Sequence, residues 1–313
     1  MRFHMLPSRW PEVIEQVRQI AADQGFELQH TERAEDADFL VLNGGAGDLP
    51  RPLPPGVGYV QYVFAGVERP AEAGAFTATA PVRWANAGGL FAKPVAEVAL
   101  GLLIGLAHGV KMATVDGSFD RRWEIDARQF WLFHHKTVAL VGAGGIAREL
   151  IQMLRPFGAR TIALNRSGRE VPGAMETHPI GELDSVLSRA DVVVLTAPLT
   201  PETRGMIAAR ELALMPDHAL LVNVGRGALL DTDALVEALR NGRIAGCAMD
   251  VTEPEPLPPD HPLWGMDNVL ITPHIAAPGS AARMLVAPQI VENAVAFARG
   301  ERMPTEVNTE IGY

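Results

Sequence analysis

A glycine-rich turn between an apolar run and a helical segment constrains this chain more than any other feature. Residues 138–147 read Val-Ala-Leu-Val-Gly-Ala-Gly-Gly-Ile-Ala, and the helical pattern continues to residue 157. Gly142 and Gly144 allow a tight turn and a close backbone approach, and the helix N-terminus that follows attracts phosphate groups. A plain turn is the alternative, but the surrounding strand–helix–strand pattern favours a dinucleotide site. Four residues are predicted to hold the pyrophosphate: Gly142, Gly144, Gly145 and Ile146.

Short apolar runs alternate with amphipathic segments along nearly the whole chain. This alternation predicts strands joined by helices, and therefore a mostly parallel sheet covered on both faces. A chain of 313 residues exceeds the size that one hydrophobic core usually serves, so two domains are expected. The predicted strands are 39–42, 59–63, 137–141, 160–164, 191–196, 219–224, 244–251 and 268–272, and the predicted helices are 11–25, 93–110, 145–157, 182–189, 232–241 and 287–300.

The net charge limits the classes of binding partner that are expected, and the cysteine content and the N-terminus bear on the cellular compartment. The formal net charge of −10 argues against nucleic acid or an anionic membrane as a partner, because both require a basic surface. A small anion remains compatible with it. Cys247 is the only cysteine, lies in a predicted buried strand and is expected in the core. The N-terminus lacks the regions of a signal peptide, and residues 95–110 are interrupted by Glu97 and His108, so a cytoplasmic protein without a membrane span is expected.

The end of the second strand of this βαβ unit indicates which dinucleotide binds. Sites for NAD normally carry an acidic residue there, which contacts the ribose 2′-hydroxyl. Residues 163–169 read Ala-Leu-Asn-Arg-Ser-Gly-Arg and contain no carboxylate. The guanidinium groups of Arg166 and Arg169 match a 2′-phosphate in charge and geometry. We therefore predict that Asn165, Arg166 and Ser167 bind NADP(H) in preference to NAD(H), with a solvated basic loop as the alternative.

Three further segments follow predicted strands, at the edge where ligands bind in open α/β sheets. They are residues 222–227 with Arg226, 248–256 with Glu253 and Glu255, and 272–276 with His274. An arginine can hold a substrate carboxylate and polarise a carbonyl, and a histidine can exchange a proton near neutral pH. A carboxylate beside the imidazole would orient it. This set suits hydride transfer to a 2-keto acid, with either glutamate as the partner of the histidine.

From about Lys93 to the C-terminus the chain resembles the D-isomer-specific 2-hydroxyacid dehydrogenases. The resemblance rests on the glycine turn, on the three segments above, and on residues 198–203 (PLTPET), 261–264 (HPLW) and 268–269 (NV). It implies that Arg226, Glu255 and His274 are catalytic and that Asp250 lies near the nicotinamide carboxamide. Further cofactor contacts are implied for Thr196, Ala197, Pro198, Thr203, Val224, Gly225, His274 and Ala276.

The same resemblance implies an α/β fold of two doubly wound parallel-sheet domains with a cleft between them. A flavodoxin-like substrate domain would comprise residues 1–92 and 281–313, and a Rossmann dinucleotide-binding domain would comprise residues 93–280. A homodimer built largely on residues 93–110 is also implied. In the expected reaction His274, held by Glu255, protonates the carbonyl oxygen of a 2-keto acid as the hydride arrives, which gives a D-2-hydroxy acid.

The N-terminal part departs from the family pattern at its substrate loop. Residues 62–68 read Tyr-Val-Phe-Ala-Gly-Val-Glu, with bulky residues where glycines are common in the family. The N–H groups of Ala65 and Gly66 are expected to hold a carboxylate together with Arg226, and Phe64 is expected to reshape the pocket. Residues 165–167 are similar to those of NADPH-using glyoxylate and hydroxypyruvate reductases, which favours small keto acids without identifying the substrate.

Other functions on the same scaffold are weighed against this one. Phosphite oxidation would use a similar arginine, glutamate and histidine, whereas formate dehydrogenase chemistry is disfavoured because that branch has an amide at the position of Glu255. A cofactor-gated binding protein, like the transcriptional corepressors that resemble the family, is disfavoured by the intact catalytic set. No metal site is expected, because the adjacent His134 and His135 would point to opposite faces without a partner at metal spacing.

Overall fold

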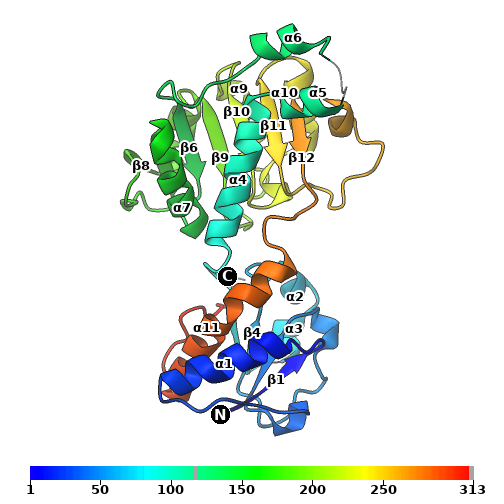
Figure 1. Cartoon of the computed structure of the whole chain (residues 1–313), viewed down its shortest axis with the longest axis vertical. Coiled ribbons are helices and arrows are strands. Elements are labelled where there is room, and N and C mark those ends of the chain that lie inside the picture. Colours follow the sequence, from blue (N-terminus) through cyan, green and yellow to red (C-terminus); the bar gives the residue numbers. More distant parts are fainter. Residues whose placement is uncertain (80, 116–118, 310–313) are drawn as a thin grey trace. The chain divides into compact units, whose positions relative to one another are not determined.

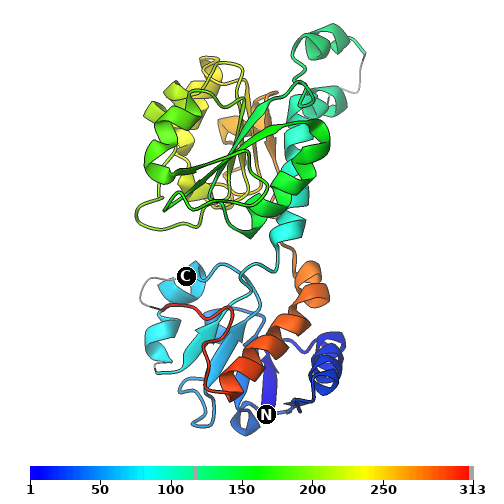
Figure 2. The same ribbon diagram turned by 90° about the vertical axis from the view of Figure 1, so that its left-hand side faces the viewer.

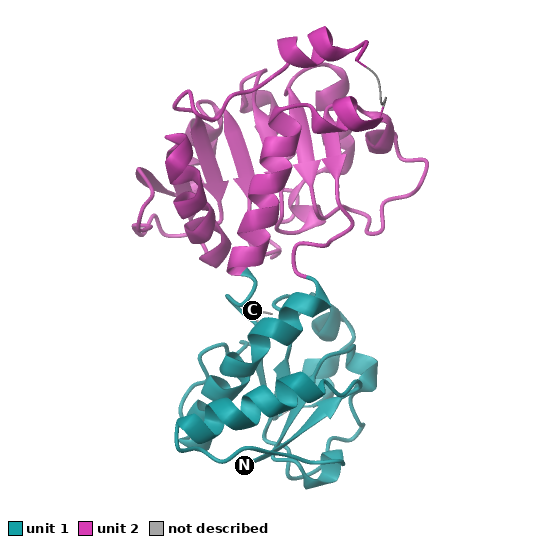
Figure 3. Cartoon of the chain, in the orientation of Figure 1, with its two compact units in different colours: residues 1–91, 278–313 teal, residues 92–277 magenta. Residues whose placement is uncertain are grey.

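The structure is a computed structural model that describes residues 1–79, 81–115 and 119–309. The chain divides into two compact units, one of residues 1–91 and 278–313 and the other of residues 92–277 (Figure 3). Residues 310–313, the end of the predicted substrate domain, lie outside the described residues. Each unit contains one parallel sheet with helices beside it, so the predicted α/β class is confirmed (Figure 1).

The first unit is a five-stranded parallel sheet with helices on both faces. Its elements are β1 (Arg2–Leu6), α1 (Pro11–Asp23), β2 (Gln29–His30), β3 (Phe39–Leu42), β4 (Tyr59–Tyr62), α2 (Glu68–Glu72), α3 (Ala75–Ala78), β5 (Arg83–Ala85) and α11 (Gly279–Ala298). The strand order β2-β1-β3-β4-β5 is that of flavodoxin-like folds. α1 and α11 pack together over one face, and α2 and α3 lie on the other (Figures 1 and 2). The central strands β3 and β4 are buried along their whole length, as expected for a sheet covered on both sides.

The second unit is a seven-stranded parallel sheet with the order β12-β11-β10-β9-β6-β7-β8. Its elements are α4 (Ala92–Ala107), α5 (Val110–Val115), α6 (Arg122–Ala127), β6 (Thr137–Val141), α7 (Gly145–Leu154), β7 (Arg160–Asn165), β8 (Glu176–Pro179), α8 (Leu183–Leu187), β9 (Val192–Leu195), α9 (Ala209–Leu214), β10 (Leu220–Asn223), α10 (Thr232–Arg240), β11 (Gly246–Met249) and β12 (Val269–Ile271). The sheet grows outward from β6 in both directions, which is the Rossmann arrangement. The reversal between β6 and β9 is the switch point at which dinucleotides bind in such sheets.

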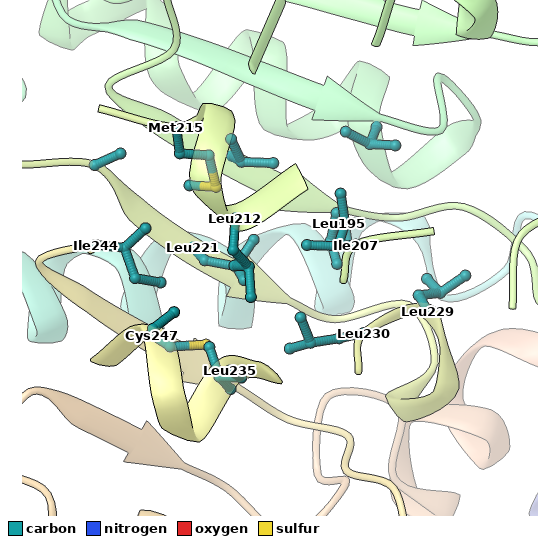
Figure 4. Packing of buried hydrophobic residues seen from close by; sticks show 14 of the residues in the cluster. Leu195, Ile207, Leu212, Met215, Leu221, Leu229, Leu230, Leu235, Ile244 and Cys247 are labelled. Carbon is teal, nitrogen blue, oxygen red and sulfur yellow. The ribbon is translucent and has the colours of Figure 1, made fainter. Parts of the chain in front are cut away.

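One buried cluster ties the strands of the second unit to the helices on one face. Leu195, Leu221 and Cys247 come from the neighbouring strands β9, β10 and β11, and they pack with Leu212 of α9 and Leu235 of α10 (Figure 4). Cys247 is buried, so its predicted place in the core is confirmed, and burial raises the pKa of its thiol. The cluster fixes the strands whose carboxyl ends carry the site described below.

Several elements differ from the sequence-based prediction. The last helix was predicted to begin at residue 287, but α11 begins at Gly279 and continues through Pro288 while packing on α1. β1, β2, β5 and β8 were not predicted, nor were the short helices α2, α3, α5, α6 and α9. β8 is a polar, half-buried edge strand and therefore lacks an apolar run. Among the helices of the described residues, none has the length and apolar character needed to span a membrane.

Candidate active site

The carboxyl ends of five neighbouring strands carry the predicted cofactor and catalytic residues. The strands in the order β12-β11-β10-β9-β6 are parallel, so the segments that follow them emerge at one edge of the sheet (Figure 1). β6 leads into Gly142, β9 into Thr196, β10 into Val224, β11 into Asp250 and β12 into Thr272. Topology alone therefore gathers these segments at one edge of the second unit.

The glycine turn after β6 is shaped by close backbone packing. Gly142 has a φ of +101°, and a Cβ on it would overlap the backbone of Ala197. Only glycine fits here, so the turn lies directly against the segment after β9. The space beside Gly144 is open, and Gly145 and Ile146 form the first turn of α7, which no side chain of the described residues caps. This turn has the room and the uncapped helix end that a pyrophosphate requires, and so it fits the predicted dinucleotide.

Asn165, the last residue of β7, shapes the loop that carries the predicted 2′-phosphate residues. Its side-chain oxygen accepts hydrogen bonds from the N–H groups of Ser167 and Arg169, both at 3.1 Å, and its amide donates to the Arg169 carbonyl at 2.6 Å. The Asn165 side chain is thus engaged within its own loop. Arg166, Ser167 and Arg169 are exposed around it, where their polar groups can meet a phosphate.

The segments after β9 and β10 pack backbone to backbone. The N–H of Val224 donates to the carbonyl of Leu195 at 3.2 Å, and a Cβ on Gly225 would lie 3.0 Å from the carbonyl oxygen of Ala197. In the loop after β9, the hydroxyl of Thr203 donates to the carbonyl of Pro198 at 2.7 Å. In the structure Thr203 therefore closes this loop, and its predicted contact with the cofactor stays a prediction.

Arg226 lies in the turn after β10, which Asn223 and Gly227 hold in place. The buried side chain of Asn223 accepts a hydrogen bond from the Gly225 N–H at 3.1 Å and donates one to the Arg226 carbonyl at 2.9 Å. A Cβ on Gly227 would overlap the backbone of Thr252, so the turn packs against the segment that leads to the predicted glutamate. Nη1 of Arg226 donates to the Gly225 carbonyl at 2.8 Å. Sequence reasoning gave Asn223 no role, although an asparagine that ends a buried strand just before a glycine turn is a usable signal.

His274 and Glu255 are joined directly. Nδ1 of His274 lies 2.8 Å from Oε1 of Glu255, and their side chains are 42% and 32% exposed, so the pair is accessible to a ligand. The carboxylate that contacts His274 is that of Glu255, the partner that the resemblance implied. Within the described residues, this arrangement engages Nδ1 and leaves Nε2 available for proton exchange.

Asp250 fixes the backbone on which His274 sits. Its buried carboxylate accepts hydrogen bonds from the Thr272 hydroxyl at 2.6 Å and from the N–H groups of Ile275 and Ala276, both at 2.9 Å. Its carbonyl accepts the N–H of His274 at 2.8 Å. His274 has a φ of +53°, a conformation that costs energy for a residue with a side chain and persists only where the surroundings enforce it. Asp250 therefore enforces the strained turn that aims the imidazole, and this role was missed from the sequence.

The predicted substrate loop belongs to the first unit. Phe64, Ala65 and Gly66 follow β4, and the ring of Phe64 packs edge-to-face on that of Tyr62 with centroids 5.4 Å apart. Their part in substrate binding stays a prediction. In the part of the chain that the structure describes, no three histidine, cysteine or acidic side chains are grouped to hold a metal ion.

Comparison with known proteins identifies the family to which this arrangement belongs. The sequence model described as the D-isomer specific 2-hydroxyacid dehydrogenase NAD-binding domain matches residues 100–276, more than half of the chain. The chain belongs to the D-isomer specific 2-hydroxyacid dehydrogenase family. It is therefore an NAD(P)-dependent oxidoreductase with a Rossmann domain, as the sequence predicted.

Individual relatives extend the likeness over the whole dehydrogenase. An uncharacterized protein of the proB 3′ region in Corynebacterium melassecola is 44% identical over 313 residues, 100% of each chain. A glyoxylate reductase from Thermococcus gammatolerans is 32% identical, with 99% of this chain and 92% of that enzyme aligned. Among solved structures, a D-isomer specific 2-hydroxyacid dehydrogenase from Xanthobacter autotrophicus Py2 in complex with NADPH and MES is 26% identical, with a TM-score of 0.80 over 100% of this chain and 99% of that one.

Proposed function

We propose that this dehydrogenase reduces a small 2-keto acid to the D-2-hydroxy acid, and catalyses the reverse reaction, with NADP(H) as the preferred cofactor. The observation that carries the proposal is the hydrogen-bonded pair of His274 and Glu255, at the sheet edge that also carries Arg226 and the glycine turn. The near full-length likeness to a glyoxylate reductase supports a small keto acid as substrate.

Each of the three residues has a distinct part in the proposed reaction. Arg226 binds the carboxylate of the keto acid and polarises its carbonyl. Glu255 accepts a hydrogen bond from Nδ1 of His274 and so fixes the orientation and tautomer of the ring. Nε2 of His274 gives its proton to the carbonyl oxygen in reduction and takes a proton from the hydroxyl in oxidation. The cofactor, when bound, supplies the hydride.

An assay of NADPH consumption against a panel of acids tests this function. Glyoxylate, hydroxypyruvate and pyruvate are the first 2-keto acids to compare, and chiral analysis of the product determines its configuration. Phosphite with NADP⁺ belongs in the same panel, because its oxidation would use a similar set of side chains. Reduction of at least one keto acid supports the proposal. Oxidation of phosphite without reduction of any keto acid would contradict it.

The cofactor preference rests on the loop after β7. The glycine turn would hold the pyrophosphate, and Arg166, Ser167 and Arg169 would hold the 2′-phosphate, because all three are exposed around the Asn165 turn. The NADPH complex of the structural relative from Xanthobacter autotrophicus supports this choice. The preference concerns only the 2′ position of the adenosine ribose, which carries a phosphate in NADP and a hydroxyl in NAD.

Replacing Arg166 by aspartate is expected to weaken the binding of NADPH by roughly 1–3 kcal/mol, the scale of hydrogen bonds to charged groups. The same substitution brings a carboxylate to the position that contacts a ribose 2′-hydroxyl, so the use of NADH should be retained or improved. Steady-state kinetics with both cofactors measure the change. Arg155→Asp, which alters an exposed arginine bonded to Gln152 in the same unit, is the control for net charge. Equal or better use of NADH by the unaltered enzyme would contradict the preference.

We propose that the predicted homodimer extends beyond residues 93–110 to an aromatic surface that follows them. Within α4, Val95 and Leu103 are buried in their own unit, whereas Phe119, Trp123 and Phe133 are 88%, 69% and 55% exposed. Phe119 and Trp123 line the same surface pocket, and exposed apolar side chains gathered in one place are typical of an interface. The double variant Phe119→Glu/Trp123→Glu is expected to lower the mass in light scattering from that of two chains to that of one. A monomeric unaltered enzyme would contradict the proposal.

A further inference from the structure

A side chain beside the predicted substrate loop has no part in the mechanism above. Asn86 follows β5, the parallel neighbour of β4, so it emerges at the same sheet edge as the loop after β4. Its Nδ2 donates to the carbonyl of Ala65 at 2.7 Å, and its Oδ1 accepts the N–H of Gly88 at 2.9 Å. Next to it, the N–H of Ala87 donates to the carbonyl of Phe64 at 3.0 Å. Two successive carbonyls of the substrate loop are thus held by residues 86–88.

The hydrogen bonds to these two carbonyls determine where two N–H groups of the substrate loop point. In a trans peptide the N–H points opposite to the carbonyl of the same peptide plane. Because residues 86–88 hold the carbonyls of Phe64 and Ala65, the N–H groups of Ala65 and Gly66 point away from them. Neither N–H donates a hydrogen bond to any described residue. Adjacent unpaired backbone N–H groups form a concave site for an anion, and these are the two groups predicted to hold the substrate carboxylate.

The backbone of Asn86 is itself held by a buried polar network. Its N–H donates to the carbonyl of Thr305 at 3.0 Å, and its carbonyl accepts the Thr305 hydroxyl at 2.7 Å and the amide of Gln61 at 3.1 Å. Asn293 of α11 donates to Gln61 at 2.7 Å and to Thr305 at 2.8 Å, and both Gln61 and Asn293 are fully buried. Such a network keeps one arrangement, because rotation of any member would leave a buried polar group unpaired.

We propose that Asn86 is a positioning residue for carboxylate recognition: by holding the Ala65 carbonyl it sets the Gly66 N–H in the orientation that binds the substrate, beside the Ala65 N–H, which the bond from Ala87 to the Phe64 carbonyl sets. The inference rests on the proposed function and deepens it. Asn86 acts through Ala65 and does not itself contact the substrate. Without its amide, the Ala65 peptide can rotate and present its carbonyl oxygen, which repels a carboxylate.

Asn86→Asp tests the proposal with the smallest change in shape. An aspartate keeps the acceptor for Gly88 but places an acceptor opposite the Ala65 carbonyl, so it removes the hydrogen bond under test and adds one negative charge, which the control variant must also add. The KM for glyoxylate is expected to rise by about tenfold to hundredfold, the scale of one hydrogen bond to a charged group, with little change in kcat or in the KM for NADPH.

The chain contains a matched control for this substitution. Asn43 follows β3 at the same sheet edge and makes the same two-way contact with a neighbouring loop: its Nδ2 donates to the Ser8 carbonyl at 2.6 Å, and its side-chain oxygen accepts the Ser8 N–H at 3.2 Å. Asn43→Asp should therefore perturb its loop to a similar degree but leave the KM for glyoxylate at the level of the unaltered enzyme.

Selectivity separates positioning from a merely structural role. Glycolaldehyde carries a hydroxymethyl group where glyoxylate carries its carboxylate, so the preference for glyoxylate should fall in Asn86→Asp but not in Asn43→Asp. An equal loss for both substrates, or an unchanged KM for glyoxylate, would overturn the inference. If thermal unfolding shows that Asn86→Asp is not folded, Asn86→Ser takes its place. A smaller rise in the KM for glyoxylate is then expected, because serine keeps a short donor.

Failure of the proposed function would give a different result. An unaltered enzyme that reduces no 2-keto acid contradicts the function, and the positioning role is then measured by calorimetry with oxalate as the anion. Weaker oxalate binding in Asn86→Asp than in Asn43→Asp supports the role of Asn86, and equal binding in the two variants refutes it.

Discussion

His274→Ala is expected to lower the turnover of keto-acid reduction by at least about hundredfold, the scale of general acid–base catalysis. Hydride addition leaves a negative charge on the substrate oxygen, and alanine has no proton to give. Because His274 sits at a φ of +53°, His274→Asn is a useful second variant, since asparagine tolerates this conformation better than most residues but cannot act as the acid. Steady-state kcat with saturating glyoxylate and NADPH measures both effects.

The control for this experiment lies at the opposite edge of the same sheet. His218 precedes β10 and Asp191 precedes β9, and Nε2 of His218 lies 2.9 Å from Oδ1 of Asp191. This is the same type of pair as His274 and Glu255, but it stands at the amino ends of the strands. His218→Ala should keep the turnover of the unaltered enzyme. A His274→Ala enzyme that does the same would remove the His274–Glu255 pair from the mechanism.

The parts of the molecule that depend on neighbours in sequence could be predicted well. The glycine turn is recognisable because Gly142 and Gly144 stand between an apolar run and a helical pattern, and the structure places them between β6 and α7. Arg226, Glu255 and His274 could be expected at one sheet edge, because parallel strands joined by helices carry their following segments on the same side. The resemblance also implied that Glu255 holds His274, and in the structure their side chains lie 2.8 Å apart.

Contacts between segments that are distant along the chain could not be predicted from the sequence. The carboxylate of Asp250 binds N–H groups of Ile275 and Ala276, 25 and 26 residues away, and nothing near Asp250 announces these partners. The asparagine at the end of β7 is the opposite case. Asn165 bonds to residues two and four positions ahead, a local turn that its residue type favours, so its loop-shaping role could have been predicted.

The start of the last helix and the edge strand β8 show the same difference between local signals and distant contacts. The amphipathic pattern of residues 287–300 indicated the last helix, but α11 begins already at Gly279, and it packs on α1. β8 lies at the edge of its sheet, where only one neighbouring strand pairs with it, and its residues are polar and half-buried. Hydrophobic periodicity cannot indicate such a strand, because no continuous apolar face is required of it.

Arg226→Gln is expected to lower kcat/KM for glyoxylate by roughly 10²–10³, the scale of losing one preorganised charged donor at a reacting carbonyl. Arg226→Lys should recover only part of the loss, because lysine keeps the charge but not the planar fork that binds a carboxylate with two hydrogen bonds. Gly227, next in sequence, packs against the backbone of Thr252, so thermal unfolding must confirm that each variant keeps the turn. Arg204→Gln, which changes an exposed arginine of the same unit, controls for charge.

The choice of substrate then assigns the two roles proposed for Arg226. Holding the carboxylate affects glyoxylate alone, whereas polarising the carbonyl affects glyoxylate and glycolaldehyde alike. A larger loss with glyoxylate therefore measures carboxylate binding, and the loss shared by both substrates measures polarisation. Unchanged kcat/KM for both substrates in a folded Arg226→Gln enzyme would mean that the guanidinium contacts neither group. The anion would then have to be recognised elsewhere, and the arrangement of His274 and Glu255 alone would not select a keto acid over a simple aldehyde.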